Sequence, residues 1–331
     1  MDWTLPLPKT RCPVTLVEDL SQDHSSLARS HNALRRLLNA LEEFAPGRGD
    51  LVKTAICALL SEGHVLIEDV PGVGKTTFIK ALAKLSGLEA TRIQCTSDLL
   101  PSDVIGVQIY HDAERRFEFH QGPIFTNILL ADELNRASPR TQSALLEAMG
   151  EGQVTIERTS KPLKRPFIVF ASQNPIESIG TYPLPESQLD RFAVKLKIGY
   201  PTTDHELRVF QAIRKDPLAA LPSSIISAED LRLLMSMTDK IHISASVAHY
   251  AKRVVDRSRA SESIRVGIST RGGLMWMRLS AAMAILNGRD YVIPDDLQIL
   301  AVPALAHRIL PTSGTNHDEA IRHLITTTSV N

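Results

Sequence analysis

The first half of the chain alternates helical patterns with short apolar runs. Apolar residues recur at helical spacing from Ser30 to Phe44 and again in LVKTAICALLSEG, where Asp50 is expected to cap the second helix. Five runs of strand length follow: HVLIED (64–69), TRIQC (91–95), NILLADE (127–133), PFIVFASQN (166–174) and AVKLKI (193–198). Because helical segments lie between several of these runs, the order predicts an α/β fold with a parallel sheet.

The pattern becomes helical after Pro201. Five segments carry helical periodicity: 202–215, 227–240, 244–260, 270–288 and 294–310. We therefore expect three parts: an irregular N-terminal extension over residues 1–28, where prolines disfavour a helix, an α/β core over 29–200, and an all-helical domain over 201–331.

The loop EDVPGVGKTT, between the first strand and the next helix, resembles a phosphate-binding loop. Gly74, Lys75 and Thr76 fit the end of the pattern G-x-x-x-x-G-K-[ST], but Asp69 stands at its first glycine. Strand, glycine-rich turn and helix are the context in which backbone amides converge on phosphate, so we prefer this interpretation to an ordinary surface turn and expect Asp69 to be tolerated. The predicted ATP-binding residues are Pro71, Gly72, Val73, Gly74, Lys75, Thr76 and Thr77.

Two acids end the third apolar run and extend this prediction. Asp132 would hold Mg²⁺ together with the Thr76 hydroxyl, and Glu133 would orient and deprotonate an attacking water. An Asp-Glu pair after apolar residues is common by chance. The phosphate loop upstream is what makes a catalytic role the preferred interpretation.

Composition narrows the class of protein. Lys+Arg and Asp+Glu both count 37, so no basic excess favours nucleic acid or an anionic membrane. The three cysteines form no C-x-x-C pair, no apolar run is long enough to span a membrane, and the N-terminus lacks signal-peptide features, so we expect a cytoplasmic protein. The eleven histidines form no H-x-x-x-H cluster, and we expect no metal apart from nucleotide-bound Mg²⁺.

At this point four stretches show a family resemblance. They resemble the MoxR family of AAA+ ATPases, in the helix-2-insert clade, and occur in the family's order: QCTSDLLPSDVIG, ILLADELNRASPRTQSALLEAMGEGQVTI, ASQNPIESIGTYPLPESQLDRF and GRDYVIPDDL. The resemblance runs from about residue 30 to about residue 310, and EDVPGVGKTT also resembles the family's usual loop. It implies an AAA+ P-loop NTPase sheet flanked by helices, followed by a C-terminal helical lid domain.

The resemblance also assigns catalytic roles. The phosphate loop matches Walker A, and the Asp132–Glu133 pair matches Walker B. Asn174 matches sensor 1, which holds the attacking water or the γ-phosphate, although Asn174-Pro175 also suits a turn. Arg191 matches the arginine finger given to a neighbouring subunit, with a structural salt bridge as the alternative. Arg271 matches sensor 2 on the lid, which couples nucleotide state to the angle between domains.

Two segments are predicted to form hairpins, over residues 100–125 and 153–170. In the family they are the helix-2 insert and the hairpin before sensor 1, which face the channel of the ring. Basic side chains at their tips suit either contact with a polymer or partner protein, or plain solvation, and the aromatic residues of the first hairpin are expected to pack on it. The basic residues are Arg115, Arg116, Arg158, Lys161, Lys164 and Arg165, and the aromatic ones are Tyr110, Phe117 and Phe119.

The resemblance implies a Mg²⁺-dependent ATPase that forms a homo-oligomeric ring, a hexamer, with nucleotide at subunit interfaces. It would act as a chaperone that remodels a client protein or inserts a metal or cofactor, in some relatives through a separate von Willebrand factor A domain protein. The alternative is a DNA-acting motor or a transcription regulator. Residues 90–125 lack the GAFTGA loop that marks AAA+ transcription activators. A third hypothesis, a scaffold that binds nucleotide without hydrolysing it, ranks last because Glu133 and Arg191 are present. FAPGRGDL (44–51) replaces the family's iiGQ-like segment near the adenine.

Overall fold

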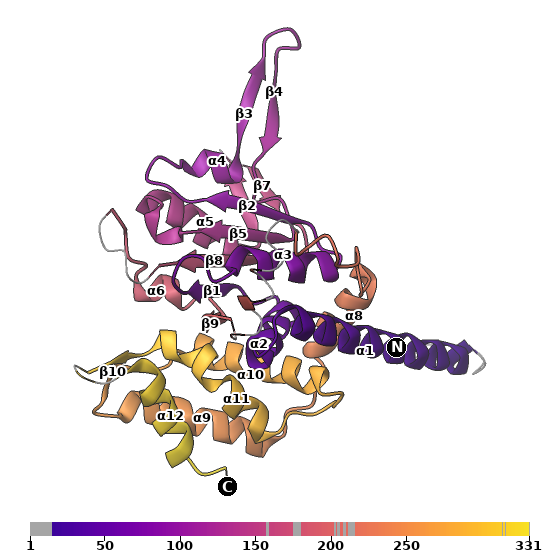
Figure 1. Ribbon diagram of the computed structural model, residues 1–331, viewed down its shortest axis with the longest axis vertical. Coiled ribbons are helices and arrows are strands. Elements are labelled where there is room, and N and C mark those ends of the chain that lie inside the picture. The colour runs from indigo at the N-terminus through magenta and orange to yellow at the C-terminus, as the bar shows by residue number, and fades with distance from the viewer. Residues whose placement is uncertain are drawn as a thin grey trace, which may run out of the picture.

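The five apolar runs form a single parallel sheet, which confirms the predicted α/β class. The computed structural model describes residues 15–156, 159–174, 180–201, 203, 206–207, 210, 216–312, 314 and 316–330, with side chains from Leu27 onward. The strand order is β2-β5-β8-β1-β9, and every pairing is parallel (Figure 1). The strands are β1 (Val65–Glu68), β2 (Ala90–Gln94), β5 (Ile128–Asp132), β8 (Ile168–Gln173) and β9 (Val194–Leu196).

Strand residues alternate between two hydrophobic cores, one on each face of the sheet. Ile67, Leu130 and Phe170 join the core that contains α2, α3 and the lid helices. Leu66 and Leu129 join the core beneath α5. This period of two explains why the runs of β1, β5 and β8 are largely apolar: both faces of these central strands are buried. The helices are α2 (Gly49–Leu60), α3 (Lys75–Leu85) and α5 (Pro139–Glu151), with α6 (Glu186–Leu189) and the 3-10 turn η1 (Leu134–Arg136) between strands.

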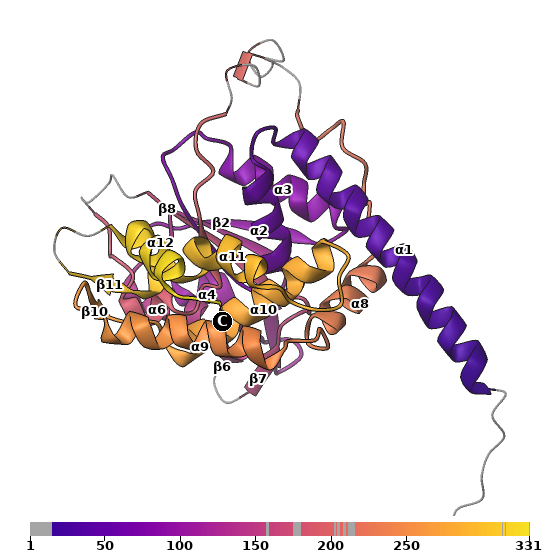
Figure 2. The same ribbon diagram turned by 90° about the horizontal axis from the view of Figure 1, so that it is seen from below.

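The N-terminal helix is longer than the periodicity predicted. Helix α1 spans Thr15–Phe44, so the expectation of an irregular segment is wrong for residues 15–28, and residues 1–14 lie outside the described chain. Figure 2 shows its first turns extending beyond the body of the molecule. The prolines that disfavoured a helix all precede Thr15. Asp50 lies in the first turn of α2, but Arg48 holds the cap position, so the predicted cap was wrong.

Helices of the second half form a lid beneath the sheet (Figure 1). Four of the five predicted helices are confirmed, whereas segment 202–215 falls mostly outside the described residues. The buried Trp276 donates its indole N–H to the Leu297 carbonyl at 2.8 Å and so joins two lid helices. The lid elements are α8 (Ala228–Thr238), α9 (Ala245–Ala260), β10 (Ile264–Val266), α10 (Thr270–Leu286), α11 (Pro294–Leu305), η2 (Ala306–Arg308), β11 (Leu310–Pro311) and α12 (His317–Thr327). The prediction of an all-helical domain was wrong in one respect, because β10 and β11 form a short antiparallel pair.

Two antiparallel hairpins leave the sheet, as predicted. The first, β3 (Gly106–His111) with β4 (Arg116–Gln121), follows the short helix α4 (Pro101–Ile105) and projects as an arm (Figure 1). The second, β6 (Gln153–Ile156) with β7 (Thr159–Pro162), is shorter than predicted, because residues from Ile168 onward belong to the central sheet. Lys164 and Arg165 therefore lie beyond its arms rather than at a tip, and Arg158 lies outside the described residues.

A polar junction attaches the lid to the core at the segment before β9. The Asp190 carboxylate pairs with the buried Arg308 guanidinium at 2.6 Å and accepts a hydrogen bond from Ser269, the cap of α10, at 3.1 Å. Arg308 also donates to the Phe192 carbonyl at 2.6 Å. These contacts fix the start of α10 against the segment that carries Arg191.

Two buried histidines predict an acid-sensitive fold. His64 accepts from the Val169 N–H at 3.1 Å and contacts the Met149 carbonyl at 3.0 Å, and burial lowers its pKa to about 4. Burial lowers the pKa of His307 to about 3. Below the ordinary pKa of 6.5 the unfolded chain binds protons that the folded chain does not. The free energy of unfolding should therefore fall as pH drops from 6.5 toward 4, by up to about 1.4 kcal/mol per pH unit for each histidine.

Urea unfolding between pH 7 and pH 4.5 measures this slope. His64→Gln should reduce it, because glutamine does not titrate, while His249→Ala on the exposed face of α9 should leave it unchanged. Equal slopes in the wild type and His64→Gln would contradict the assignment.

Candidate nucleotide site

The predicted phosphate loop adopts a conformation that suits anion binding. Gly72 and Gly74 have φ values of 85° and 90°, and Gly74 is the cap residue of α3. A Cβ atom added to either glycine would meet nothing within 4 Å, so their side of the loop is open. The first turn of α3 carries no acid, and its free amides present the positive end of the helix. The loop therefore has room and charge for a phosphate group.

Asp69 is an integral part of this loop rather than a tolerated variation. Its carboxylate accepts hydrogen bonds from the Ile198 and Gly199 amides at 2.7 and 2.6 Å and from the Val70 amide at 2.8 Å. The Lys75 ammonium donates to the Asp69 carbonyl at 2.7 Å. The side chain at the motif's first glycine position thus ties the loop to the segment after β9.

The acids at the end of β5 lie beside the loop. Thr76 Oγ1 is 3.3 Å from Asp132 Oδ2, and the buried Ser172 hydroxyl donates to Asp132 Oδ1 at 3.2 Å. Ser172 also accepts the Glu133 N–H at 3.0 Å, with Glu133 in the left-handed conformation at φ 57°. A hydroxyl and a carboxylate are the oxygen donors that Mg²⁺ prefers, so the residues present fit this ion.

Two residues of β2 complete the surroundings of the acids. Arg92 Nε pairs with Asp132 Oδ2 at 2.6 Å, and Gln94 donates to Glu133 Oε2 at 3.0 Å. Arg136 is 3.2 Å from the same Glu133 oxygen. The roles of Arg92, Gln94 and Ser172 were not predicted from the sequence. The available signal was the polar alternation in TRIQC and FASQN at the ends of strands predicted to lie in parallel.

Asn174 follows β8, the strand between β1 and β5. It is buried, and it lies at the same edge of the sheet as the phosphate loop and the acids because all three strands end there. The structure therefore brings together five predicted groups, namely those of Lys75, Thr76, Asp132, Glu133 and Asn174. Pro175, the second residue of the alternative turn, is outside the described residues.

A cavity of about 620 Å³ opens beside the phosphate loop. Loop residues form one wall, and Phe44, Arg48, Tyr200 and Phe210 contribute to the others. Arg48 donates to the Gly199 carbonyl at 2.7 Å and so holds this wall to the segment that Asp69 contacts. The size and the aromatic lining suit a nucleotide base. FAPGRGDL therefore lies in the position expected for a segment near the base.

The two predicted arginines lie away from this cavity. Arg191 Nη1 donates to the Leu146 carbonyl, in the second half of α5, at 2.5 Å. Arg271 is exposed in the first turn of α10. Burial is the main cause of the lowered pKa of His64, and the positive charge of Arg271 lowers that pKa further. His64 precedes β1, whereas the phosphate loop follows that strand. Neither arginine lines the cavity.

Comparisons with known proteins agree with this geometry. Residues 64–194 match the ATPase family associated with various cellular activities (AAA), and residues 256–324 match the AAA lid domain. Chaperone MoxR1 of Mycobacterium tuberculosis is 38% identical over 88% of this chain and 80% of its own length. The chain belongs to the MoxR family of AAA+ ATPases. Its predicted ATPase class and the predicted lid are thereby confirmed.

Other relatives of this MoxR-family ATPase extend the similarity over most of the chain. The uncharacterized protein YeaC of Bacillus subtilis is 46% identical over 85% of this chain and 88% of that protein. A crystal structure from Cytophaga hutchinsonii, of a protein assigned as an ATPase, superposes with a TM-score of 0.85 at 35% identity, covering 94% of this chain and 98% of that one. In the described part of the chain, no helix is long and apolar enough to cross a membrane.

The contacts of Asp69 predict that its removal loosens the nucleotide loop. Asp69→Ala deletes three hydrogen bonds to a half-buried carboxylate, so the free energy of unfolding should fall by roughly 1–3 kcal/mol and ATP should bind more weakly. Urea unfolding and titration with a fluorescent ATP analogue measure the two effects. Asp112→Ala, on the exposed end of the first hairpin, is the matched control. Wild-type values for Asp69→Ala in both assays would show that the carboxylate has no such role.

Proposed function

We propose that this chain works as a ring of identical subunits, a hexamer, that binds ATP and Mg²⁺ between neighbours. The placement of Arg191 carries the proposal. It lies with Arg271 near the beginning of β1, whereas the phosphate loop and the acids lie at the strand ends. In a head-to-tail ring, the arginines of one subunit face the nucleotide of the next. Arginine stabilises the charge that develops during phosphoryl transfer.

The geometry at the strand ends supports the other roles in this proposal. Lys75 and the loop amides bind the phosphates, and Thr76 and Asp132 hold Mg²⁺, which when bound neutralises charge on the β- and γ-phosphates. Glu133, oriented by Gln94 and Arg136, takes the proton of the attacking water. Asn174 holds that water or the γ-phosphate in place. Arg271 senses the nucleotide from the lid, and the Asp190 junction passes its movement to the core.

We propose that hydrolysis remodels a client protein, by maturing it or by inserting a metal or cofactor. The relative named Chaperone MoxR1 supports this function. The first hairpin offers the client an apolar docking surface. Its exposed apolar side chains are those of Val107, Ile109, Tyr110 and Phe117. Tyr110 and Phe117 also pack against each other at 5.1 Å, as predicted, so the surface is ordered. A client would dock here directly or through a separate protein with a von Willebrand factor A domain.

The DNA-acting alternative receives less support. Arg116 pairs with both Glu114 and Glu118, and Lys164 pairs with Glu89. These acids offset the basic groups that a phosphate backbone would need.

Kinetics test the shared site. The specific ATPase activity of the wild type should rise with protein concentration, because only the assembled ring is complete. Arg191→Ala should lower turnover by about 10³-fold or more while nucleotide binding persists. Arg140→Ala, an exposed arginine on α5, should behave as wild type.

Mixing two inactive variants sharpens the test. In a one-to-one mixture of Glu133→Gln and Arg191→Ala chains, about a quarter of the ring interfaces combine an intact Glu133 with an intact Arg191. Activity should return to about that fraction of the wild type. If the specific ATPase activity does not change with protein concentration and Arg191→Ala remains active, the chain is instead a monomeric nucleotide switch.

A further inference from the structure

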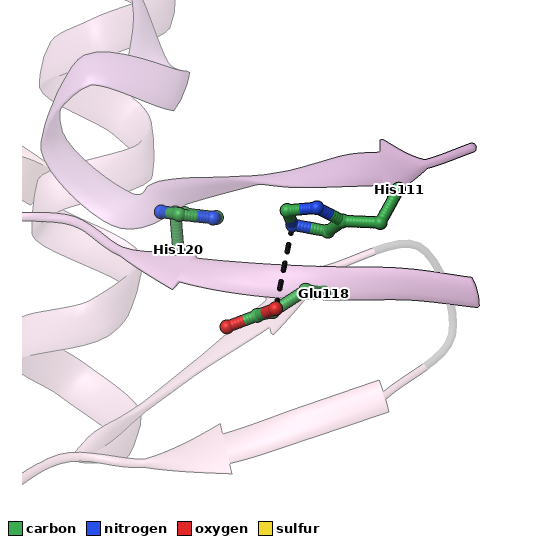
Figure 3. A group of neighbouring side chains, drawn as sticks. All are labelled: His111, Glu118 and His120. Carbon is green, nitrogen blue, oxygen red and sulfur yellow. Dashed lines mark ion pairs between the residues drawn. The ribbon is translucent and has the colours of Figure 1, made fainter. Parts of the chain in front are cut away.

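Three metal-ligating side chains meet on one face of the first hairpin. His111 comes from β3, and Glu118 and His120 come from β4 (Figure 3). In the register, His111 pairs with Arg116 and His120 pairs with Val107. Residues two positions apart on a strand share a face, so all three side chains project on the same side. Their candidate ligand atoms all lie within 4.8 Å of one another.

The two imidazoles and the carboxylate are arranged as a group rather than scattered on the surface. His111 Nε2 lies 3.3 Å from a Glu118 carboxylate oxygen, and the His111 and His120 rings stack with centroids 6.2 Å apart (Figure 3). His111 Nε2 is shielded from solvent, and its contact with Glu118 lacks hydrogen-bond geometry. A shielded polar nitrogen without a hydrogen bond is unfavourable. A metal ion between Nε2 and the carboxylate would remove this deficit.

The ligand set indicates which metals fit. Imidazole nitrogen suits Zn²⁺, Cu²⁺, Ni²⁺ and Co²⁺, and two histidines with one carboxylate form a common three-ligand set for such ions. Mg²⁺ prefers an all-oxygen shell, so the nucleotide's ion would not compete well for these residues. Arg116 works against a cation here, because its guanidinium lies 3.9 Å from the same Glu118 oxygen. Its pairing with Glu114 on the other side offsets part of that charge.

We propose that His111, Glu118 and His120 form a binding site for a divalent transition-metal ion on the exposed hairpin. Three protein ligands leave coordination positions open, and Glu118 and His120 are exposed. The ion therefore remains accessible to a ligand from outside the chain. The site is separate from the nucleotide site, which uses Thr76 and Asp132. A search for H-x-x-x-H spacing within one segment misses it because the ligands come from two strands.

Metal titration of the full-length chain tests the site without nucleotide. The protein is stripped with a chelator, and Zn²⁺ binding is measured by calorimetry in the presence of excess Mg²⁺. The wild type should bind Zn²⁺ at the hairpin, and His111→Ala, His120→Ala and Glu118→Gln should each weaken that binding about tenfold or more. His249→Ala, which removes an exposed histidine from α9, is the matched control and should bind as the wild type does. Equal binding by all five proteins, or no binding by the wild type, would overturn the proposal.

A second readout reports where the metal binds. Zn²⁺ should slow amide hydrogen exchange in β3 and β4 of the wild type, because the ion links the two strands, and should not do so in His120→Ala. Exchange in the lid helices serves as the internal reference and also shows that each variant is folded. Protection that persists in His120→Ala would contradict the assignment. Because no nucleotide is present, these outcomes do not depend on whether the chain forms an active ring.

Discussion

The parallel direction of the five strands is the constraint on which the rest of this structure depends. Because β1, β5 and β8 all run the same way, the phosphate loop, the acid pair and Asn174 share one edge although they lie far apart in sequence. The same constraint sends α5 back across the sheet, so that Met149 meets His64 at the beginning of β1. Arg191 contacts this second half of α5. One chain therefore carries the proposed binding and hydrolytic groups at one edge of the sheet and the two arginines near the other, which is why we infer that a neighbour completes the site.

Asp190 gives the lid a defined relation to those arginines. It precedes Arg191 in the chain, caps α10 through Ser269 and pairs with the buried Arg308. Removing two charges from water costs several kcal/mol, so a buried ion pair is a weak source of stability. Its value is geometric: in the present orientation of the lid, Ser269 and Arg308 both contact the Asp190 carboxylate. A rotation of the lid must break these contacts or carry Asp190 with it, and Arg191 would move in consequence. Nucleotide sensing by Arg271 and completion of the neighbouring site by Arg191 are thus mechanically linked in our proposal.

The sequence predicts those features whose cause is local or periodic, and misses those that depend on distant partners. The central strands were predictable because both of their faces are buried. The loop was predictable because Gly74, Lys75 and Thr76 have fixed spacing. The role of Asp69 was not predictable, because its partners Ile198 and Gly199 lie about 130 residues away in the chain. Arg92, Gln94 and Ser172 acquire their roles only from strand order. The start of α1 was missed because the prolines before Thr15 were taken to disfavour a helix further along the chain. Proline acts only locally, and none occurs between Thr15 and Ser30. The grouping of His111, Glu118 and His120 could be recognised only from the register between β3 and β4.

That hairpin has unequal faces, and the difference bears on what holds it together. β3 and β4 pair only with each other among the described strands, and an isolated two-stranded hairpin is marginally stable in water. One face is aromatic: Phe119 packs on Phe125, and the Lys161 ammonium lies 5.1 Å from the Phe119 ring centre. The other face presents His111, Glu118 and His120, whose exposed ion pairs contribute little. A bound metal ion would replace these weak contacts with a link between the strands. The order of the arm that we propose to meet client proteins would then depend on metal supply as well as on nucleotide.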